Sequence, residues 1–166
     1  MILIGVGANL PSPRFGPPRA TCEAGVAALE AADLPVAARA PWYETAPVAS
    51  PPDAPWFVNG VVRLADWPPP EPLLERLHAI EADFGRARGE VNAPRVLDLD
   101  LLAWHDTVNP GPTPPVLPHP RLAERAFVLC PLADVAPGWR HPVTGSTVEA
   151  MLAALPADQA VHRAGA

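Results

Sequence analysis

Two aspartates, Asp98 and Asp100, lie two residues apart in an otherwise apolar stretch. The alternation of apolar residues and aspartates predicts a β-strand from Pro94 to Leu102, in which both carboxylates point to one face. Side chains placed in this way are about 6–7 Å apart, a span that suits divalent cations also bound by polyphosphate oxygens. The alternative is an ordinary amphipathic strand with two solvated carboxylates, and the spacing alone leaves both interpretations open.

Three arginines, Arg86, Arg88 and Arg95, lie in a segment over 86–95 that is expected to be a loop and to lead directly into the aspartates. Guanidinium groups beside an acidic metal site suit a polyphosphate, because the metal neutralises some oxygens and the arginines bind others. A solvated basic loop that merely offsets the aspartates is the alternative. The chain contains no lysine, which excludes a lysine-dependent phosphate-binding loop of the Walker type.

Two further polar residues are candidates for a binding site. Asn59 interrupts the apolar face that Phe57 and Val61 share on a predicted strand, so it either forms a structural hydrogen bond or binds a polar ligand. His119 follows a proline-rich loop and precedes Arg121 and Arg125. A histidine after a proline is most simply a loop residue, and the neighbouring arginines are what make it a candidate.

The elements that would position these residues follow from periodicity and from turn residues. The pattern predicts strands, long loops and two main helices, the second with Leu73, Leu77, Ile80 and Phe84 inward and Gly85 as its C-cap. Pro41 indicates an edge or a bulge, and a capping-box pattern at 146–149 predicts a last helix that ends near Leu155. The expected strands are 36–44, 57–65 and 94–102, and the stretch 2–10 is expected to begin as a strand and to end in a Gly/Asn turn. The main helices are expected at 18–31 and 70–84, and the long loops at 45–55 and 109–118.

Length and composition predict a single domain over residues 1–166 with a substantial core. We expect no membrane span and no signal peptide, because no apolar run is long enough and the N-terminus lacks a basic region before an apolar block. The net charge of −6 argues against non-specific nucleic-acid binding. Cys22 and Cys130 have neither zinc nor redox spacing, which favours buried free thiols. A monomer in a reducing cytoplasm is expected.

Taken together, several segments in chain order resemble the 6-hydroxymethyl-7,8-dihydropterin pyrophosphokinase family over nearly the whole chain. The block from Pro94 to Asp100 is the most specific of them. The segments are Gly7-Ala8-Asn9-Leu10, Trp42-Tyr43-Glu44-Thr45-Ala46-Pro47, Phe57-Val58-Asn59, Ile80-Glu81-Ala82-Asp83-Phe84-Gly85-Arg86, Pro94-Arg95-Val96-Leu97-Asp98-Leu99-Asp100, Leu117-Pro118-His119-Pro120-Arg121 and Arg125-Ala126-Phe127.

This resemblance implies a ferredoxin-like α+β sandwich, with a mainly antiparallel sheet and helices packed on it. It implies transfer of the β,γ-diphosphate of ATP to the hydroxymethyl group of the pterin, with release of AMP, in folate biosynthesis. ATP is then the co-substrate, and two Mg²⁺ ions are the cofactor. No nucleic acid or membrane is implied as a partner.

The resemblance also assigns roles to residues. Asp98 and Asp100 match the carboxylates that hold the two Mg²⁺ ions, and Arg86 and Arg95 match arginines that bind phosphate and stabilise the transferring group. Further ATP contacts are implied for Arg88, Leu101, His119 and Arg125. Contacts to the pterin are implied for Thr45, Pro47, Val48, Phe57, Asn59 and Phe127, with the two aromatic rings enclosing the pterin and the amide binding its polar edge.

The chain also departs from the family pattern. Ala8 replaces a serine, and the segment before Pro94 reads Val-Asn-Ala where relatives commonly carry Arg-Trp-Gly. Pro120 stands in place of a tyrosine, and Pro114-Pro115 lies where relatives can offer an arginine to the nucleotide. We therefore expect altered loop closure and weaker or differently arranged ATP contacts.

Two other functions are compatible with parts of the pattern. One is a non-catalytic pterin- or nucleotide-binding homologue, against which the presence of both aspartates together with Arg86 and Arg95 argues. The other is a metal-dependent phosphohydrolase that uses Asp98 and Asp100. The apparent pterin pocket, and the lack of an evident general base to activate water, argue against that second function.

Overall fold

The computed structural model describes residues 1–46, 55–65, 69–85 and 96–165. A six-stranded antiparallel sheet has the order β5-β1-β4-β3-β6, and β2 also pairs with β4. Its strands are β1 Ile2–Ala8, β2 Val36–Arg39, β3 Tyr43–Thr45, β4 Phe57–Leu64, β5 Asp98–Trp104 and β6 Val161–Arg163. The helices are α1 Pro18–Ala31, α2 Pro70–Asp83, α3 Ala126–Val135 and α4 Val148–Ala154, with a 3₁₀ turn at Leu122–Glu124.

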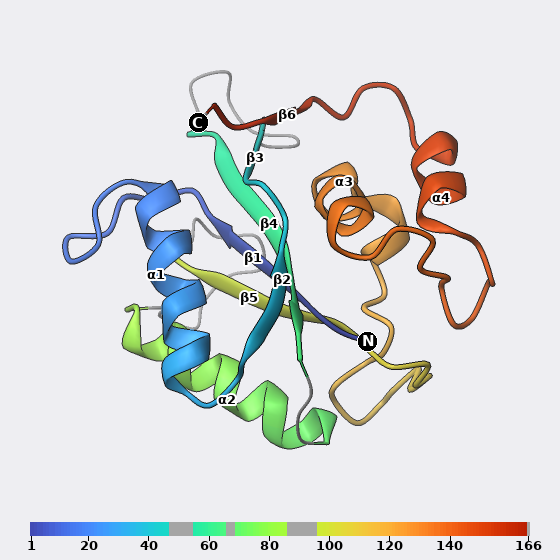
Figure 1. Ribbon diagram of the computed structural model, residues 1–166, viewed down its shortest axis with the longest axis horizontal. Coiled ribbons are helices and arrows are strands. Elements are labelled where there is room, and N and C mark those ends of the chain that lie inside the picture. Colours follow the sequence, from blue (N-terminus) through green and yellow to red (C-terminus); the bar gives the residue numbers. More distant parts are fainter. Residues whose placement is uncertain (47–54, 66–68, 86–95, 166) are drawn as a thin grey trace.

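The first five strands and two helices follow the β-α-β-β-α-β order of a ferredoxin-like fold, with β2 and β3 as two halves of the second strand. Figure 1 shows α1 and α2 on one side of the sheet and α3 and α4 on the other. The expected α+β class, with helices packed on an antiparallel sheet, is confirmed.

Both faces of the sheet are buried, each in its own apolar cluster. Ile4 and Val62 pack with α1 and α2, whereas Leu3 and Val61 pack with α3 and α4. Neighbouring residues of one strand enter opposite clusters because side chains alternate between the faces. The second layer, formed by α3 and α4, covers the face that also carries the two aspartates.

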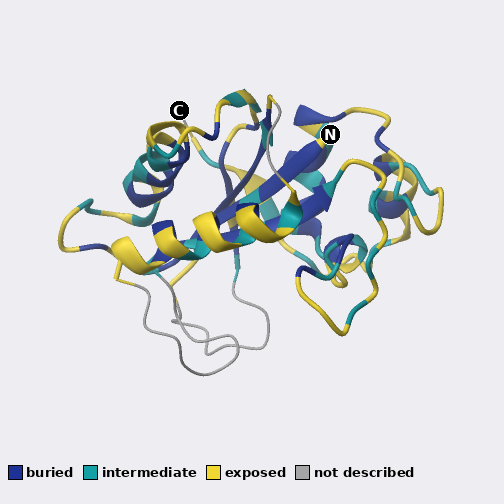
Figure 2. Cartoon of the chain, turned by 90° about the horizontal axis from the view of Figure 1, so that it is seen from below, coloured by how far each residue is buried: buried dark blue, intermediate teal, exposed yellow. Residues whose placement is uncertain are grey.

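The two main helices form where the periodicity predicts them. Helix α1 has the predicted bounds, begins with a proline in its first turn and buries Cys22, Val26 and Leu29. Helix α2 buries Leu73, Leu77 and Ile80, and Figure 2 shows its exposed outer side and its buried inner side. Gly85, just after the helix, adopts a φ of 85°, a left-handed conformation that glycine favours at a helix C-terminus.

The predicted strand 36–44 is divided into β2 and β3. Arg39 pairs with Val62 and Tyr43 pairs with Asn59, so one extra residue lies on this side of the ladder. Pro41 has no N–H with which to continue the ladder, while the Ala40 N–H still donates to the Val61 carbonyl. The bulge expected at Pro41 is therefore present, but the continuous strand was wrong.

Two elements were not predicted. Helix α3 is apolar on nearly all sides and contains Pro131, so it shows neither a one-sided stripe nor an uninterrupted helical sequence. Strand β6 has only three residues, and its pairing with β3 gives it its extended form. Both elements depend on tertiary packing rather than on local pattern.

Three predicted boundaries need correction. Thr45, expected to begin a loop, is the last residue of β3. The aspartate strand begins at Asp98 and continues to Trp104, whereas Val96 and Leu97 precede it outside the strand. Thr147 rather than Ser146 caps α4, because its side chain accepts a hydrogen bond from the Ala150 N–H at 3.2 Å.

The described part of the chain contains no helix with the length and apolar character that crossing a bilayer requires. Cys22 and Cys130 are both free thiols, as predicted; Cys22 is buried and Cys130 is half-buried.

Candidate functional site

One row of residues crosses five strands of the sheet and includes both candidate site positions on β5 and β4. Its members, in spatial order, are Asp98 on β5, Gly7 on β1, Asn59 on β4, Tyr43 on β3 and Arg163 on β6. Directly opposite residues of antiparallel strands share a face, and neighbouring strands are about 4.8 Å apart. The Tyr43 hydroxyl bonds to Asp134 of α3, so this row faces the layer of α3.

The two aspartates share the face predicted from their spacing. Asp98 pairs with Gly7 and Asp100 pairs with Gly5, so no side chain on β1 stands between the carboxylates and β4. Both aspartates are half-buried. The two carboxylates are therefore partly accessible, with only glycine opposite them on β1.

Strand β5 is held at the residue between the two aspartates by a side chain of α2. The sequence analysis did not assign a role to this side chain. Glu81 of α2 is only 3% exposed, and its carboxylate accepts the Leu99 N–H at 2.7 Å. Glu81 comes four residues after Leu77, on the inward face of α2, and a charged residue in that position was an available signal. This contact fixes the edge strand at the residue between Asp98 and Asp100.

Asn59 is buried, with its amide held between two neighbours. Its Nδ2 donates to the Thr45 Oγ1 at 2.9 Å, and a Cβ at Gly7 would lie only 2.9 Å from its Oδ1. The amide therefore lies over the bare backbone of Gly7. Thr45 is directly opposite Phe57, so Asn59, Thr45 and the half-buried Phe57 form one group on this face.

A cluster of basic residues, His119, Arg121 and Arg125, lies close to the aspartates in the segment before α3. The His119 N–H donates to the Leu102 carbonyl, and its Nδ1 accepts the Arg121 N–H at 3.2 Å. Burial and the positive charges of Arg125 and Arg121 lower the pKa of His119, against the opposing effect of Asp98. Arg121 was not among the predicted site residues, although its spacing from His119 was a signal.

Arg125 is the member of this basic cluster that lies at the start of helix α3. It is the N-cap residue of α3, and its guanidinium lies 5.4 Å from the centroid of the half-buried Phe127 ring. Burial and Arg121 lower its pKa, while Asp100 and Asp98 raise it. Within the described residues its buried Nε has no hydrogen-bond partner, which leaves a donor for an anionic ligand.

A cavity of about 260 Å³ adjoins the aspartates at the outer edge of β5. Three predicted site residues, Asp100, Leu101 and His119, line it together. Leu101 is buried, and the side chains of α2 and the proline-rich loop close the other sides. These further lining residues are Leu74, His78, Leu99, Pro114, Pro115, Val116 and Pro120.

Five predicted site residues lie outside the described part of the chain: Pro47, Val48, Arg86, Arg88 and Arg95. The replacement of Arg-Trp-Gly before Pro94 also lies there. Their predicted roles remain predictions.

The donor set on this face fits magnesium better than a closed metal centre. Among the described residues no group of three or more His, Cys, Asp or Glu side chains is arranged to hold a metal ion. Mg²⁺ typically takes one or two carboxylates and completes its octahedron with water and substrate phosphates. Asp98 and Asp100, with cations and a cavity beside them, match that pattern.

The fold and this arrangement define the class of the protein: a ferredoxin-like α+β domain with an acidic site flanked by cations on one face of its sheet. The family model for 7,8-dihydro-6-hydroxymethylpterin-pyrophosphokinase matches residues 3–137. The chain belongs to this family.

Individual relatives agree with this result. The 2-amino-4-hydroxy-6-hydroxymethyldihydropteridine pyrophosphokinase of Pseudomonas aeruginosa is 40% identical over 159 residues, 93% of this chain and 91% of its own length. The protein of the same name from Synechocystis sp. is 37% identical over 147 residues, 88% of this chain and 71% of its own length. A folic acid synthesis protein of Schizosaccharomyces pombe is 36% identical over 116 residues, 70% of this chain and 16% of its own length.

Proposed function

We propose that this chain transfers the β,γ-diphosphate of ATP to 6-hydroxymethyl-7,8-dihydropterin, forming the pterin diphosphate and AMP in folate biosynthesis. Family membership supports the reaction. The observation that carries the proposal is the row in which Asp98 and Asn59 share one face, separated only by Gly7. Asp98, at the proposed phosphate-binding end of the site, and Asn59, whose amide can bind a heterocycle, are thereby placed two strands apart.

The phosphate end of the site would use acidic and basic groups together. Asp98 and Asp100 would hold two Mg²⁺ ions, which when bound neutralise and orient the phosphate oxygens. Arg125, whose buried Nε lacks a partner among the described residues, would donate to the triphosphate, and His119 would contribute a second donor. The nucleoside would occupy the cavity lined by Leu101.

The pterin end would use shape and hydrogen bonds. A pterin is flat and carries donors and acceptors along one edge, so an amide and two aromatic faces bind it selectively. Asn59, oriented by Thr45, would bind that edge, and Phe57 and Phe127 would enclose the ring. We expect backbone groups at Pro47 and Val48 to complete this pocket.

No covalent enzyme intermediate is required, because the substrate hydroxyl itself attacks the β-phosphorus of ATP as AMP leaves. The contribution of this chain is to hold both substrates in line and to neutralise the charge that develops on phosphate oxygens. Arg86 and Arg95 are proposed to supply guanidinium groups to the transferring diphosphate, with Arg88 nearby. An arginine aimed at the transferring phosphoryl group contributes roughly 10³–10⁵ in rate in other phosphotransfer enzymes.

Variants of the aspartates test this assignment. Asp98→Asn and Asp100→Asn keep the size of each side chain but remove its charge, so we expect pterin-dependent AMP formation to fall by more than about a hundredfold. Thermal unfolding should change little, because both side chains are partly exposed. Asp106→Asn, at an exposed position just after β5, is the matched control and should remain active.

Near-normal activity in either aspartate variant would contradict the assignment of both residues as magnesium ligands. Wild-type protein that binds the pterin but forms no AMP would instead support the non-catalytic alternative. ATP breakdown independent of the pterin would support the phosphohydrolase. A cytoplasmic location and a monomeric state stay predictions.

A further inference from the structure

The C-terminal strand closes the candidate pterin side of the sheet through a ring of three polar side chains. The Tyr43 hydroxyl donates to Asp134 Oδ2 at 2.7 Å. Arg163 donates from Nε to the Tyr43 oxygen at 3.1 Å and from Nη2 to Asp134 Oδ1 at 2.6 Å. We call these three residues the β6 clasp. It joins β3, α3 and β6, which are far apart in the sequence.

The β6 clasp lies directly beside the residues proposed to bind the pterin. Tyr43 pairs with Asn59 on one side and with Arg163 on the other. Two residues further along β3, Thr45 pairs with Phe57 of β4 and with Val161 of β6. Residues opposite one another share a face, so β6 flanks the Asn59–Thr45 hydrogen bond on the face that also carries Asp98.

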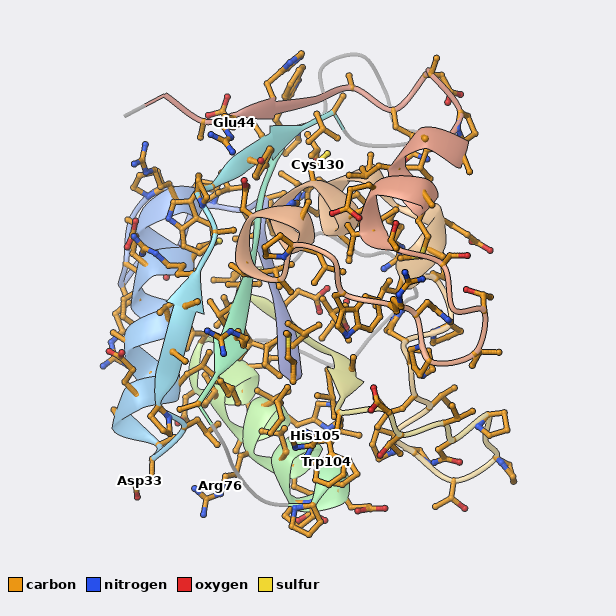
Figure 3. All side chains as sticks on the ribbon, turned by 45° about the vertical axis from the view of Figure 1, so that its right-hand side comes forward. Asp33, Glu44, Arg76, Trp104, His105 and Cys130 are labelled. Atoms are coloured by element: carbon orange, nitrogen blue, oxygen red, sulfur yellow. The ribbon has the colours of Figure 1, made fainter. Side chains whose placement is uncertain are left out.

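Figure 1 shows how the chain returns from α4 to place β6 along β3, at the end of the sheet that carries this clasp. In Figure 3 the labelled Glu44 marks β3 beside this strand, and Cys130 marks the neighbouring helix α3. The family match ends at residue 137, well before β6. Of the three clasp residues, only Arg163 therefore lies beyond the matched segment.

Burial indicates that the clasp orients groups more than it stabilises the fold. Tyr43 is 8% exposed, whereas the side chains of Arg163 and Asp134 are 62% and 24% exposed. An exposed ion pair contributes little to global stability. The two hydrogen bonds that Arg163 donates nevertheless fix the hydroxyl of the buried Tyr43 and the edge strand β6, which borders Thr45.

We propose that Arg163 is a positioning residue for the pterin, acting through the Tyr43 hydroxyl to hold β3 and its Asn59–Thr45 pair in the geometry that binds the polar edge of the ring. This inference rests on the proposed function. In this role Arg163 would make no contact with the reacting atoms. Its loss should weaken pterin binding while ATP binding and the transfer step are retained.

The test measures kcat and the KM of each substrate for Arg163→Met, Tyr43→Phe and the double variant. We expect each single variant to raise the KM for the pterin about three- to tenfold, the effect of one charge-assisted hydrogen bond that is partly solvated. The KM for ATP and kcat should remain within about twofold of wild type. If Arg163 acts through the hydroxyl, the double variant should be no worse than the worse single variant.

Two further variants separate positioning from general loosening of the C-terminal region. Arg163→Lys keeps the charge near Asp134 but not both directed bonds, and should restore part of the pterin affinity. Arg140→Met is the matched control, because Arg140 is also an exposed arginine in the C-terminal region and bonds only to the Gly145 carbonyl within the described residues. It should leave both KM values unchanged.

An unchanged pterin KM in both single variants, or equal increases in both substrates' KM values, would overturn the inference. So would a double variant whose effects multiply. Should Arg163→Met fail to fold, Tyr43→Phe decides alone, since it removes only one oxygen. Wild-type protein without pterin-dependent AMP formation would instead overturn the proposed function, so the two failures are distinguishable.

Discussion

The space above Gly7 illustrates how one missing side chain positions another. Gly7 stands between Asp98 and Asn59 in the sheet, and a Cβ there would lie 2.9 Å from Asn59 Oδ1. A methyl group in that place must push the amide aside. Because the amide is the far end of a flexible side chain, the fold can accommodate the shift, but the Asn59–Thr45 hydrogen bond cannot stay as it is.

Gly7→Ala should therefore impair pterin binding more than stability. We expect the pterin dissociation constant, measured by calorimetry, to rise about tenfold, as for the loss of one hydrogen bond and some shape fit. Gly5→Ala is the control on the same strand and face, because the atoms nearest to its Cβ would be those of the Leu102 side chain at 3.5 Å, an ordinary contact. Equal effects of the two substitutions would contradict this view of Asn59.

The turn before α4 contains a histidine that should make stability depend on pH. His141 Nδ1 accepts the N–H groups of Val143 and Thr144 at 3.3 and 3.4 Å, and burial lowers its pKa below the usual 6.5. The unfolded chain therefore binds the proton more readily than the folded one. This contribution is complete above pH 6.5 and is lost as the pH falls from there through the folded pKa.

His141→Asn tests that contribution. Asparagine can accept the same backbone N–H groups without titrating in this range. We expect the decrease in Tm between pH 7.5 and 5.5 to be smaller in the variant than in wild type. Some decrease should remain, because the pKa of His119 is lowered as well. Identical slopes in the two proteins would show that His141 does not contribute.

At the level of elements, the sequence was informative wherever a local pattern determines the outcome. The apolar stripe of α2 and the small residues of α1, with Val26 and Leu29 inward, predicted both helices. The alternation around Asp98 predicted the shared face of the aspartates. Helix α3 could not be predicted in this way, because it is apolar on nearly all sides and Pro131 interrupts it. The pairing of Tyr43 with both Asn59 and Arg163 depends on sheet register, which no local pattern reveals.

The two-faced core of the whole molecule determines how its thiols react. Burial raises the pKa of Cys22 to about 12, so very little of this thiol is ionised at pH 8. Cys130 is half-buried, and its pKa is raised by burial and by Asp134. Iodoacetamide at pH 8 should label Cys130 slowly and Cys22 only after unfolding.

Mass spectrometry of the labelled protein checks this order, with the chain in guanidinium chloride as the control in which both thiols react fast. Rapid labelling of Cys22 in the folded protein would mean that the layer between α1 and the sheet opens readily.

The most direct test of the central claim follows the products formed from Mg²⁺-ATP with and without 6-hydroxymethyl-7,8-dihydropterin. We predict AMP and the pterin diphosphate in a one-to-one ratio, and no AMP without the pterin. Formation of ADP, or of AMP at the same rate in both samples, would contradict diphosphate transfer to the pterin.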